Sequence, residues 1–515
     1  MSDAVRDESG DEAVGWRLEN SYARLPEALF ERVLPTRFPE PKTVVWNRAL
    51  ARSMGLSPER LTEGEAALLF AGQRLPAGAD PIAQAYAGHQ YGRFTMLGDG
   101  RAILLGEQRT PAGALVDVQF KGSGPTRFSR RGDGRAALGP MLREYVVSEA
   151  MSALGIPTTR SLAVATTGET VLRDDAKRGA VLVRVAASHL RVGTLQFASA
   201  RRDDATLRTL ADYAIARHDP ELAGTPDRYL GFLRAVVGRQ ASLIARWQSV
   251  GFVHGVMNTD NTAVSGETID YGPCAFMDAY DPDTVFSSID AGGRYRYSQQ
   301  PVIAEWNLAR LAEALLPLIA ADLNAAAEMA TEAVHSFRPN FEAALRTVML
   351  RKIGLGTEAV SASAASSSSE SVDAAGDDLL LRELLAWMQE TGSDFTNTFR
   401  RLPETPAPEK TGALDRQFAA WRMRWISRVD RAPASGDRSS RETAFALMNA
   451  VNPAVIPRNH RVEAALVAAE QRDDLAPFHD LVRVLSTPFA LAVADASYAD
   501  PPLPGGCDYR TFCGT

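Results

Sequence analysis

Short runs of apolar residues, interrupted by glycines and polar turns, recur in the first 200 residues and predict β-strands. Five such runs stand out: Arg101–Gly106, Val116–Lys121, Ser161–Thr166, Thr170–Arg173 and Ala180–Val185. A polar turn at Arg109–Gly113 separates the first two, which predicts an antiparallel pair. The sequence therefore indicates an antiparallel sheet in this part of the chain.

Other stretches repeat their apolar residues with the 3.6-residue period of an amphipathic helix. Met141–Leu154 is one, and Gly155 with Pro157 would end it. Further helices are predicted at Leu207–His218, Asp227–Val250, Asn307–Ile319 and Ala325–Met349. Because a strand-rich part is followed by a helix-rich part, the pattern indicates an α+β fold.

These patterns divide the chain into six regions. They are a disordered N-terminus (1–15), an N-terminal extension (16–83), a strand-rich lobe (84–200), a helical lobe (201–353), a low-complexity insertion (354–378) and a helical C-terminal region (379–515). The first is rich in acidic and small residues and offers no apolar face to bury. The insertion, GLGTEAVSASAASSSSESVDAAGDD, has the composition of a flexible segment.

Composition narrows the classes of partner. The 515 residues carry a formal net charge of −7, which gives no electrostatic reason to expect nucleic acid or a membrane surface as a partner. No run approaches the roughly 18 apolar residues of a membrane span, and the acidic N-terminus does not resemble a signal peptide. Three cysteines are too few for a disulfide framework, so a cytoplasmic protein is expected.

The segment Gly251–Pro273 concentrates polar side chains in a way that a hydrophobic core would not. Its candidate functional residues are His254, Asn258, Asp260, Asn261 and Asp270. Carboxylate and amide oxygens at this spacing suit a loop that holds a divalent cation beside a proton acceptor. Asn and Asp are also common turn formers, and a lone histidine is more often structural, so His254 and His89 are not counted as catalytic.

A second candidate element begins at the end of a predicted strand, at Lys121. The loop that follows, Gly122–Pro140, is rich in glycine and arginine, which can surround a polyphosphate with N–H groups and guanidinium forks. A solvated charged loop is the plainer alternative. In the next predicted helix Glu144 and Glu149 lie about 140° apart, so only one can face a given partner.

The order of these parts is that of a protein kinase: a strand-end lysine, a helix glutamate, and a later loop with Asp, Asn and Asp-aromatic-Gly. Two features depart from an ordinary kinase. The glycine loop is LGDGR (97–101) rather than GxGxxG, and Asp260 directly precedes Asn261 instead of lying about four residues away. Arginines are also unusually many, at 127, 130, 131, 135, 184 and 191.

Longer motifs identify a resemblance to the selenoprotein O (YdiU) family. The motifs are NSYARLP (20–26), YAGHQ.G (86–92), LGDGR (97–101), QFKGSG.T (119–126), GFVHGVMNTDN (251–261), IDYGPCAFMD (269–278) and NP.VIPRNH (452–460). The resemblance extends from about residue 16 to the end of the chain, apart from the serine-rich insertion. It implies a two-lobed kinase-like fold with an N-terminal extension and a helical C-terminal region.

The resemblance implies an activity as well: transfer of AMP from ATP to Ser, Thr or Tyr hydroxyls of proteins, with release of pyrophosphate. UMP transfer from UTP with Mn²⁺ is also open. Asp260 would be the proton acceptor, and Asn261 and Asp270 would hold Mg²⁺ or Mn²⁺. The implied nucleotide-binding residues are Gly98, Gly100, Arg101, Lys121, Asp133, Gly134, Glu144, Arg184, Arg191 and Asp270.

Two other functions fit the same residues. An ordinary kinase would transfer the γ-phosphate, and a pseudokinase would bind the nucleotide only as a scaffold, although it would need no base.

The cysteines suggest one regulatory hypothesis. Cys513 lies near the C-terminus, and it could form a disulfide with Cys274 or Cys507 if the Cα atoms approach within about 7 Å.

Overall fold

The computed structural model describes residues 14–356, 370–404, 412–432, 438–503 and 509–511. Within them, a large antiparallel sheet has the strand order β2-β4-β6-β7-β10-β9-β3, with β1 paired to β6, β5 to β4 and β8 to β10. The strands are β1 Leu18–Glu19, β2 Phe30–Arg32, β3 Lys42–Trp46, β4 Ile82–Gln90, β5 Arg93–Gly98, β6 Ala102–Arg109, β7 Leu115–Lys121, β8 Ala136–Ala137, β9 Arg160–Leu172 and β10 Ala176–Ala186. The α+β class and the β6–β7 antiparallel pair are confirmed.

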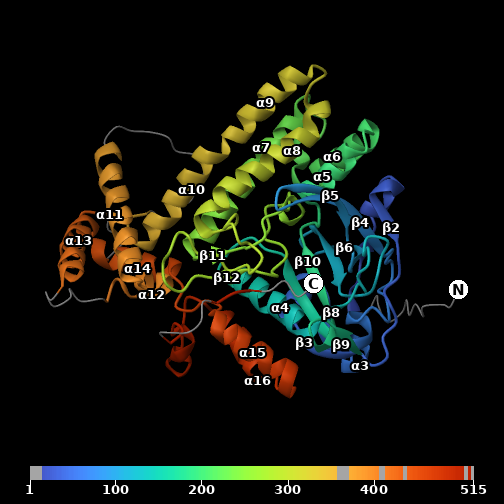
Figure 1. Ribbon diagram of the computed structural model, residues 1–515, viewed down its shortest axis with the longest axis horizontal. Helices are drawn as coiled ribbons and strands as arrows, with labels where there is room; N and C mark the ends of the chain where they lie inside the picture. Colours follow the sequence, from blue (N-terminus) through green and yellow to red (C-terminus); the bar gives the residue numbers. More distant parts are fainter. Residues whose placement is uncertain (1–13, 357–369, 405–411, 433–437, 504–508, 512–515) are drawn as a thin grey trace.

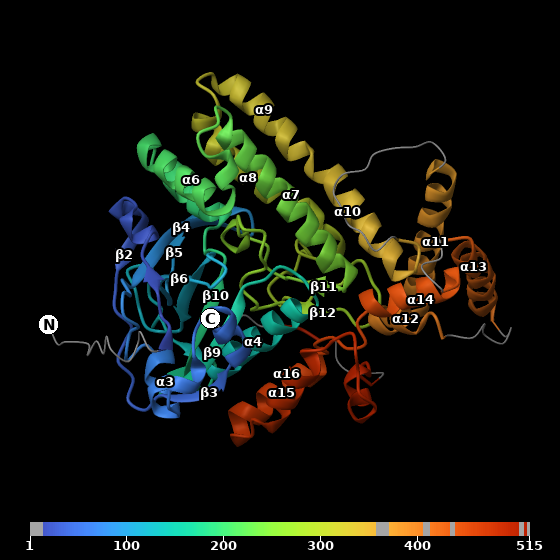
Figure 2. The ribbon, with the colours of Figure 1, turned by 180° about the vertical axis from the view of Figure 1, so that it is seen from behind.

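Most helices follow the sheet along the chain, but α2 (Arg48–Ser53) and α3 (Glu63–Phe70) precede β4 and pack on the face of β9 and β10 opposite α4. The other helices lie on two sides of the sheet (Figures 1 and 2). On one side lie α5 Val192–Ala200, α6 Asp204–His218, α7 Arg228–Ser249, α8 Gln300–Ile319, α9 Leu323–His335 and α10 Phe337–Lys352. Helix α7 is the centre of their apolar core, with Phe232, Val236 and Ile244 fully buried. The predicted long helix is thus observed, shorter by one residue at each end.

On the other side, α4 Leu138–Ala153 packs against β9 and β10 and is covered in turn by α15 Asn459–Arg472 and α16 Ala476–Leu485. Tyr145 and Phe478 meet in this layer, with ring centroids 5.9 Å apart. The helix-rich C-terminal region also contains α11 Glu370–Thr391, α12 Phe395–Arg401, α13 Ala413–Asp430 and α14 Ser440–Val451, which share a separate aromatic core. None of the described helices has the length and apolar content needed to cross a bilayer.

Two predicted elements differ in continuity from the observed ones. The two strands predicted at Ser161–Thr166 and Thr170–Arg173 are one strand, β9, which continues across an irregularity in its pairing with β10 where Gly168 takes a φ of +76°. The helix predicted at Ala325–Met349 is two, α9 and α10, separated at Ser336. Pro339 lies in the first turn of α10, where its missing N–H is tolerated and the helix before it must end.

The structure adds detail within three of the predicted regions. The N-terminal extension is part of the sheet, since residues 16–83 supply β1, β2 and β3. Residues 1–13 lie outside the described part, but Val14, expected in the disordered segment, is buried. Of the insertion expected at 354–378, the last residues form the start of α11, where Asp377 pairs with Arg428 at 2.7 Å; residues 357–369 lie outside the described part.

A buried arginine ties the C-terminal region to the rest of the molecule. Arg458, in the loop before α15, has a side chain only 1% exposed and contacts Asp278 and Asp394, each at 2.7 Å. Its second terminal nitrogen donates to the Ala499 carbonyl at 3.0 Å. Because Asp278 follows β12 (Ala275–Phe276), this cluster fixes the C-terminal helices to the segment that ends the polar loop.

We expect Arg458→Met to lower the free energy of unfolding by about 3 kcal/mol, because it leaves two partly buried carboxylates without a cation. The matched control is Arg483→Met, since Arg483 makes an exposed pair with Asp495 that should contribute little to stability. Denaturant unfolding measures both changes, and equal effects would contradict the stabilising role of Arg458.

Candidate functional site

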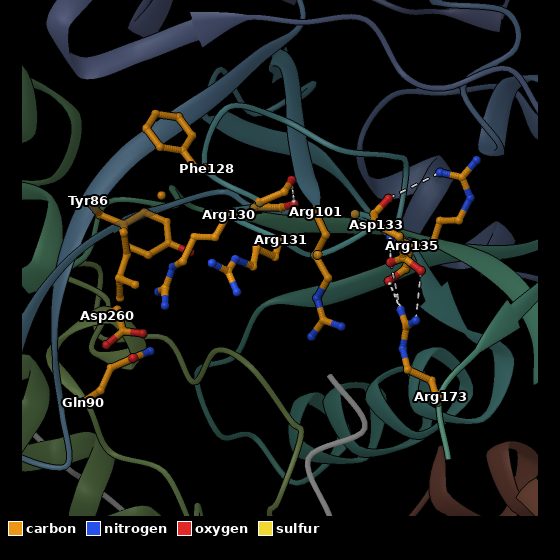
Figure 3. A pocket seen from close by; sticks show the side chains of 16 residues that line it. Tyr86, Gln90, Arg101, Phe128, Arg130, Arg131, Asp133, Arg135, Arg173 and Asp260 are labelled. Carbon is orange, nitrogen blue, oxygen red and sulfur yellow. Dashed lines mark hydrogen bonds and ion pairs between the residues drawn. The ribbon is translucent and has the colours of Figure 1, made fainter. Parts of the chain in front are cut away.

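A cavity of about 720 Å³ opens between the β4–β5 hairpin, the loop after β7 and the 3₁₀ turn Thr259–Asn261 (Figure 3). Its lining includes three guanidinium groups, from Arg101, Arg130 and Arg131, that point into the space between Asp260 at one end and Arg173 at the other. None of the three makes an ion pair with a carboxylate in the described residues. The cavity therefore offers three guanidinium groups without an ion-pair partner among the described residues, and a carboxylate in the same space.

Lys121 lies at the end of β7 and makes two ion pairs. Its Nζ contacts Glu144 Oε2 of α4 at 2.5 Å and Asp270 Oδ1 at 2.8 Å. The other Glu144 oxygen accepts from Arg184 at 3.3 Å. Glu149 lies elsewhere and pairs with Arg160 at 2.7 Å, as the helical spacing of the two glutamates predicts.

Asp270 has an unusual backbone as well as strong charge partners. Its φ of +68° is a left-handed conformation that few non-glycine residues adopt. Burial alone would raise the pKa of its carboxyl group, but Lys121, Arg101 and Arg184 hold that pKa far below its ordinary value. Asp270 is therefore ionised at any physiological pH.

Asp260 lies in a different environment. The β4–β5 hairpin holds the turn that carries it, because the backbone N–H of His89 donates to Thr259 Oγ1 at 2.8 Å and that of Tyr91 donates to Asn258 Oδ1 at 3.1 Å. Asp260 Oδ1 is buried and accepts no hydrogen bond from a described residue, although Gln90 lies beside the carboxyl group (Figure 3). Burial raises the pKa of Asp260 to about 6. This carboxyl group can gain and lose a proton near neutral pH.

Gly88 makes room for that carboxyl group. A Cβ atom added at Gly88 would lie 2.2 Å from Asp260 Oδ1, so β4 and the turn approach each other too closely for any side chain. Gly193 in α5 similarly has no space, because a Cβ there would lie 1.9 Å from the Ala87 carbonyl oxygen. Both glycines therefore allow the short distance between Asp260 and strand β4.

Asn261 and Asp270 are the residues that could hold a metal. The Asn261 side-chain nitrogen donates to the Val256 carbonyl at 3.1 Å, which leaves its oxygen available as a ligand. One carboxylate and one amide oxygen suit Mg²⁺, which keeps several waters and also binds substrate phosphates. The described residues contain no group of three or more His, Cys, Asp or Glu side chains placed to bind a metal alone. The donor set thus fits a metal that takes its remaining ligands from water or from a bound phosphate group.

The loop after β7 is held against β5 by close packing at glycines. A Cβ at Gly98 would lie 2.3 Å from the Phe128 ring, and one at Gly134 would lie 2.2 Å from the Gly124 carbonyl carbon. Gly100 also approaches the Phe128 carbonyl oxygen closely. The predicted site residues Gly98, Gly100 and Gly134 all line the cavity, so packing and a ligand-binding role both favour glycine there.

The remaining predicted residues divide into two groups. Asp133 lines the cavity, where its carboxyl group is bound by Arg173 at 2.9 Å, and this contact lowers its pKa. Arg184 and Arg191 are buried behind the lining. Arg184 donates to Gln119 at 2.5 Å, and Arg191 pairs with Asp99 at 3.5 Å and lies 4.2 Å from the centre of the Tyr86 ring, which lines the cavity.

Some lining residues were not among the predicted site residues. They are Tyr86, Gln90, Leu97, Phe128, Ser129, Arg130, Arg131, Gly132, Arg135 and Arg173. Tyr86 and Gln90 lie in the YAGHQ.G motif, which was the available signal for both. Within this motif, Gly88 approaches Asp260 closely and Gln90 lies beside it. His254, by contrast, is structural: it is buried, stacks on Trp247 and bonds the Ile269 carbonyl oxygen at 2.9 Å.

A smaller cavity of about 370 Å³ is lined by Lys121, Glu144 and Asp270, which do not line the larger one, and by the C-terminal residues Tyr509–Thr511. Arg101 lines both cavities. Cys274 is buried nearby, and burial raises the pKa of its thiol to about 12, so it is not a ready nucleophile. Thr511 Oγ1 donates to the Pro273 carbonyl at 2.7 Å. Cys507 and Cys513 lie outside the described residues, so the disulfide hypothesis stays a prediction.

We expect Gly88→Ala to lower kcat by roughly 100-fold, because the added methyl group must displace Asp260 by about 1 Å or more. Nucleotide affinity should change little, since the arginines of the cavity are on other elements. Gly64→Ala is the matched control, because a Cβ at Gly64 meets nothing within 4 Å. Steady-state kinetics and nucleotide titration decide it, and an unchanged kcat would show that Gly88 does not position Asp260.

Comparison with known proteins identifies the family to which this chain belongs. A family model described as protein adenylyltransferase SelO matches residues 13–486. Proteins named protein nucleotidyltransferase YdiU are 51% identical in Nitrosococcus oceani (98% of each chain) and 52% identical in Halalkalibacterium halodurans (99% of this chain and all of the relative). The one from Methylorubrum populi is 53% identical over 96% of this chain and 99% of its own. The chain therefore belongs to the SelO family of nucleotidyltransferases.

Proposed function

We propose that this protein transfers AMP from ATP to Ser, Thr or Tyr hydroxyl groups of other proteins and releases pyrophosphate. The observation that carries the proposal is the cavity with a titratable Asp260 at one end and, beyond it, three arginines without an ion-pair partner among the described residues. Three guanidinium groups offset most of the negative charge of a triphosphate and suit its oxygens in hydrogen-bonding geometry. UTP with Mn²⁺ is a second candidate substrate pair, since no described residue of the cavity selects adenine by its chemistry alone.

The arrangement supports a kinase-like interpretation of the fold. A strand-end lysine paired to a helix glutamate, followed by a second half that supplies Asp260, Asn261 and Asp270, is the order and pairing that kinases use. We infer that β4–β10 with α4 form the first lobe and that α5–α10 form the second. The nucleotide would lie between them, in the cavity that both lobes border.

The direction of the nucleotide follows from the positions of charge. In our proposal the β- and γ-phosphates lie among Arg101, Arg130 and Arg131, and the α-phosphorus lies nearest Asp260. Lys121 would contact the phosphates from the side of Asp270. Glu144 and Arg184 are positioning residues, since they hold Lys121 from behind.

The transfer step then needs one proton acceptor. The acceptor hydroxyl oxygen bonds to the α-phosphorus, its proton passes to the Asp260 carboxylate, and the bond between the α-phosphorus and the pyrophosphate oxygen breaks. Asn261 and Asp270 would hold Mg²⁺ or Mn²⁺, which when bound neutralises phosphate charge. The cavity arginines would stabilise the negative charge of the departing pyrophosphate.

Labelled ATP distinguishes this proposal from its alternatives. With a mixture of acceptor proteins we expect label from α-phosphate-labelled ATP to become covalently attached to protein, and label from γ-phosphate-labelled ATP to leave as pyrophosphate. Attachment of γ-label alone would identify an ordinary kinase. Binding without attachment of either label would identify a pseudokinase scaffold.

The pKa of Asp260 predicts the pH dependence. Only the ionised carboxylate accepts a proton, so kcat/KM should rise about tenfold per pH unit below pH 6 and level off above about pH 6. Rates measured between about pH 5 and pH 8 test this. A flat profile over that range would contradict the role of Asp260 as proton acceptor.

The variant Asp260→Asn tests the same role of Asp260, because it should lower activity and raise stability. Transfer should fall by about 100-fold to 10,000-fold, the usual contribution of a general base. Because burial disfavours the ionised form in the folded state, the wild-type side chain destabilises the fold as pH rises from about 4 to about 6. The variant should therefore unfold at a higher temperature than wild type, by a margin that grows over this range and is constant above it.

A further inference from the structure

The β4–β5 hairpin has two different faces. Side chains alternate between the faces of a strand, so Gly88, which contacts Asp260, and its partner Thr95 belong to the inner face. The cross-strand pairs Ala87–Met96 and His89–Phe94 belong to the outer face. On β4 this outer face is covered by α5, where Ala87 is fully buried, whereas on β5 it is open to solvent at Phe94 and Met96.

The outer face carries exposed apolar side chains. Phe94 and Met96 are each 46% exposed, and Tyr91 at the turn is 36% exposed. Single exposed apolar residues are ordinary, but three within six residues form a patch. The patch continues onto α8, because the Phe94 ring packs on His89 at 5.2 Å and His89 packs on Trp306 at 5.1 Å.

Positive charge borders this patch. The Arg294 guanidinium lies 5.1 Å from the centre of the Trp306 ring, and Arg93 is exposed beside Phe94. In the part of the chain that the structure describes, neither arginine makes an ion pair, whereas Arg310 on the same tryptophan pairs with Glu313 at 2.6 Å. An apolar patch flanked by two unneutralised cations is complementary to a segment that carries an apolar side chain and a carboxylate.

We propose that this surface, formed by Phe94, Met96 and Trp306 and flanked by Arg93 and Arg294, docks the acceptor protein through a segment with an apolar or aromatic residue next to an acidic residue. The inference rests on the proposed function, since it assigns a recognition element to the protein that receives the nucleotide. Docking on the outer face raises the local concentration of the hydroxyl group at Asp260 on the inner face.

The distance around the hairpin sets the number of residues between the docking residues of the acceptor and its modified hydroxyl group. From Met96 to the turn and back to the level of Gly88 is roughly 25 Å along the strands, at about 3.3 Å per residue. An extended acceptor segment needs about seven or eight residues for this distance. The docking residues should therefore lie roughly that far from the hydroxyl group that is modified.

Synthetic peptides and α-phosphate-labelled ATP test the proposal. Each peptide contains one hydroxyl-bearing residue, and the test positions lie seven or eight residues from it. Four sets of peptides carry at those positions an apolar and an acidic residue, the apolar residue alone, the acidic residue alone, or neither. With wild-type protein we expect the first set to be labelled with a KM roughly 10-fold lower than the set with neither. The double variant Phe94→Thr, Met96→Thr keeps both arginines, so it should raise the KM of the first set to that of the set with the acidic residue alone.

Leu172→Thr is the matched control, because Leu172 is 75% exposed and lies on β9, outside the patch. It should keep the wild-type preference. Arg93→Glu with Arg294→Glu should reverse the charge preference, so that a lysine in place of the acidic residue is favoured. Equal KM values for all four sets, or a double variant that keeps the preference, would overturn the docking surface while leaving transfer intact. No label on any peptide would contradict the proposed transfer to proteins and this inference with it.

Discussion

The ion pairs of Lys121 are the interaction on which the site depends. Lys121 and Arg184 bring two positive charges into the interior, and Glu144 and Asp270 bring two negative ones, so the cluster is neutral as a whole. Each charge alone would be costly to bury, and removing one leaves the others without compensation. The four residues come from β7, β10, α4 and the loop after β11 (Phe252–Val253). Their ion pairs therefore hold the sheet against the helical part of the chain.

Close backbone packing is the second constraint. The glycines at 88, 98, 134 and 193 each lie where a Cβ atom would collide with a neighbouring segment. The composition of the loop Gly122–Pro140 predicts only a segment able to surround a polyphosphate. In the folded chain these glycines have a packing role as well, because they let the hairpin, the loop after β7 and the Asp260 turn approach closely enough to enclose one cavity.

The spacing of apolar residues and the turn residues predicted the elements that depend on neighbouring residues alone. The antiparallel β6–β7 pair, the helices α4, α6 and α7, and the different partners of Glu144 and Glu149 all follow from periodicity and turn residues. Continuity across Gly168 and the helix break at Ser336 depend on tertiary packing and on one proline, so they were not foreseen. The cavity positions of Tyr86, Gln90 and Arg173 were also missed, because residues far apart in sequence meet there only after folding.

The two aspartates of the polar loop show how one fold gives similar groups different chemistry. Both are largely buried, and burial favours the neutral form of each. Lys121 reverses that preference for Asp270, whereas Asp260 Oδ1 has no donor among the described residues. Their pKa values are therefore driven apart, the arrangement that separates a permanent charge from a proton acceptor. Under the proposed function, Asp270 can hold a cation at any physiological pH, and Asp260 remains free to take the proton of the acceptor hydroxyl.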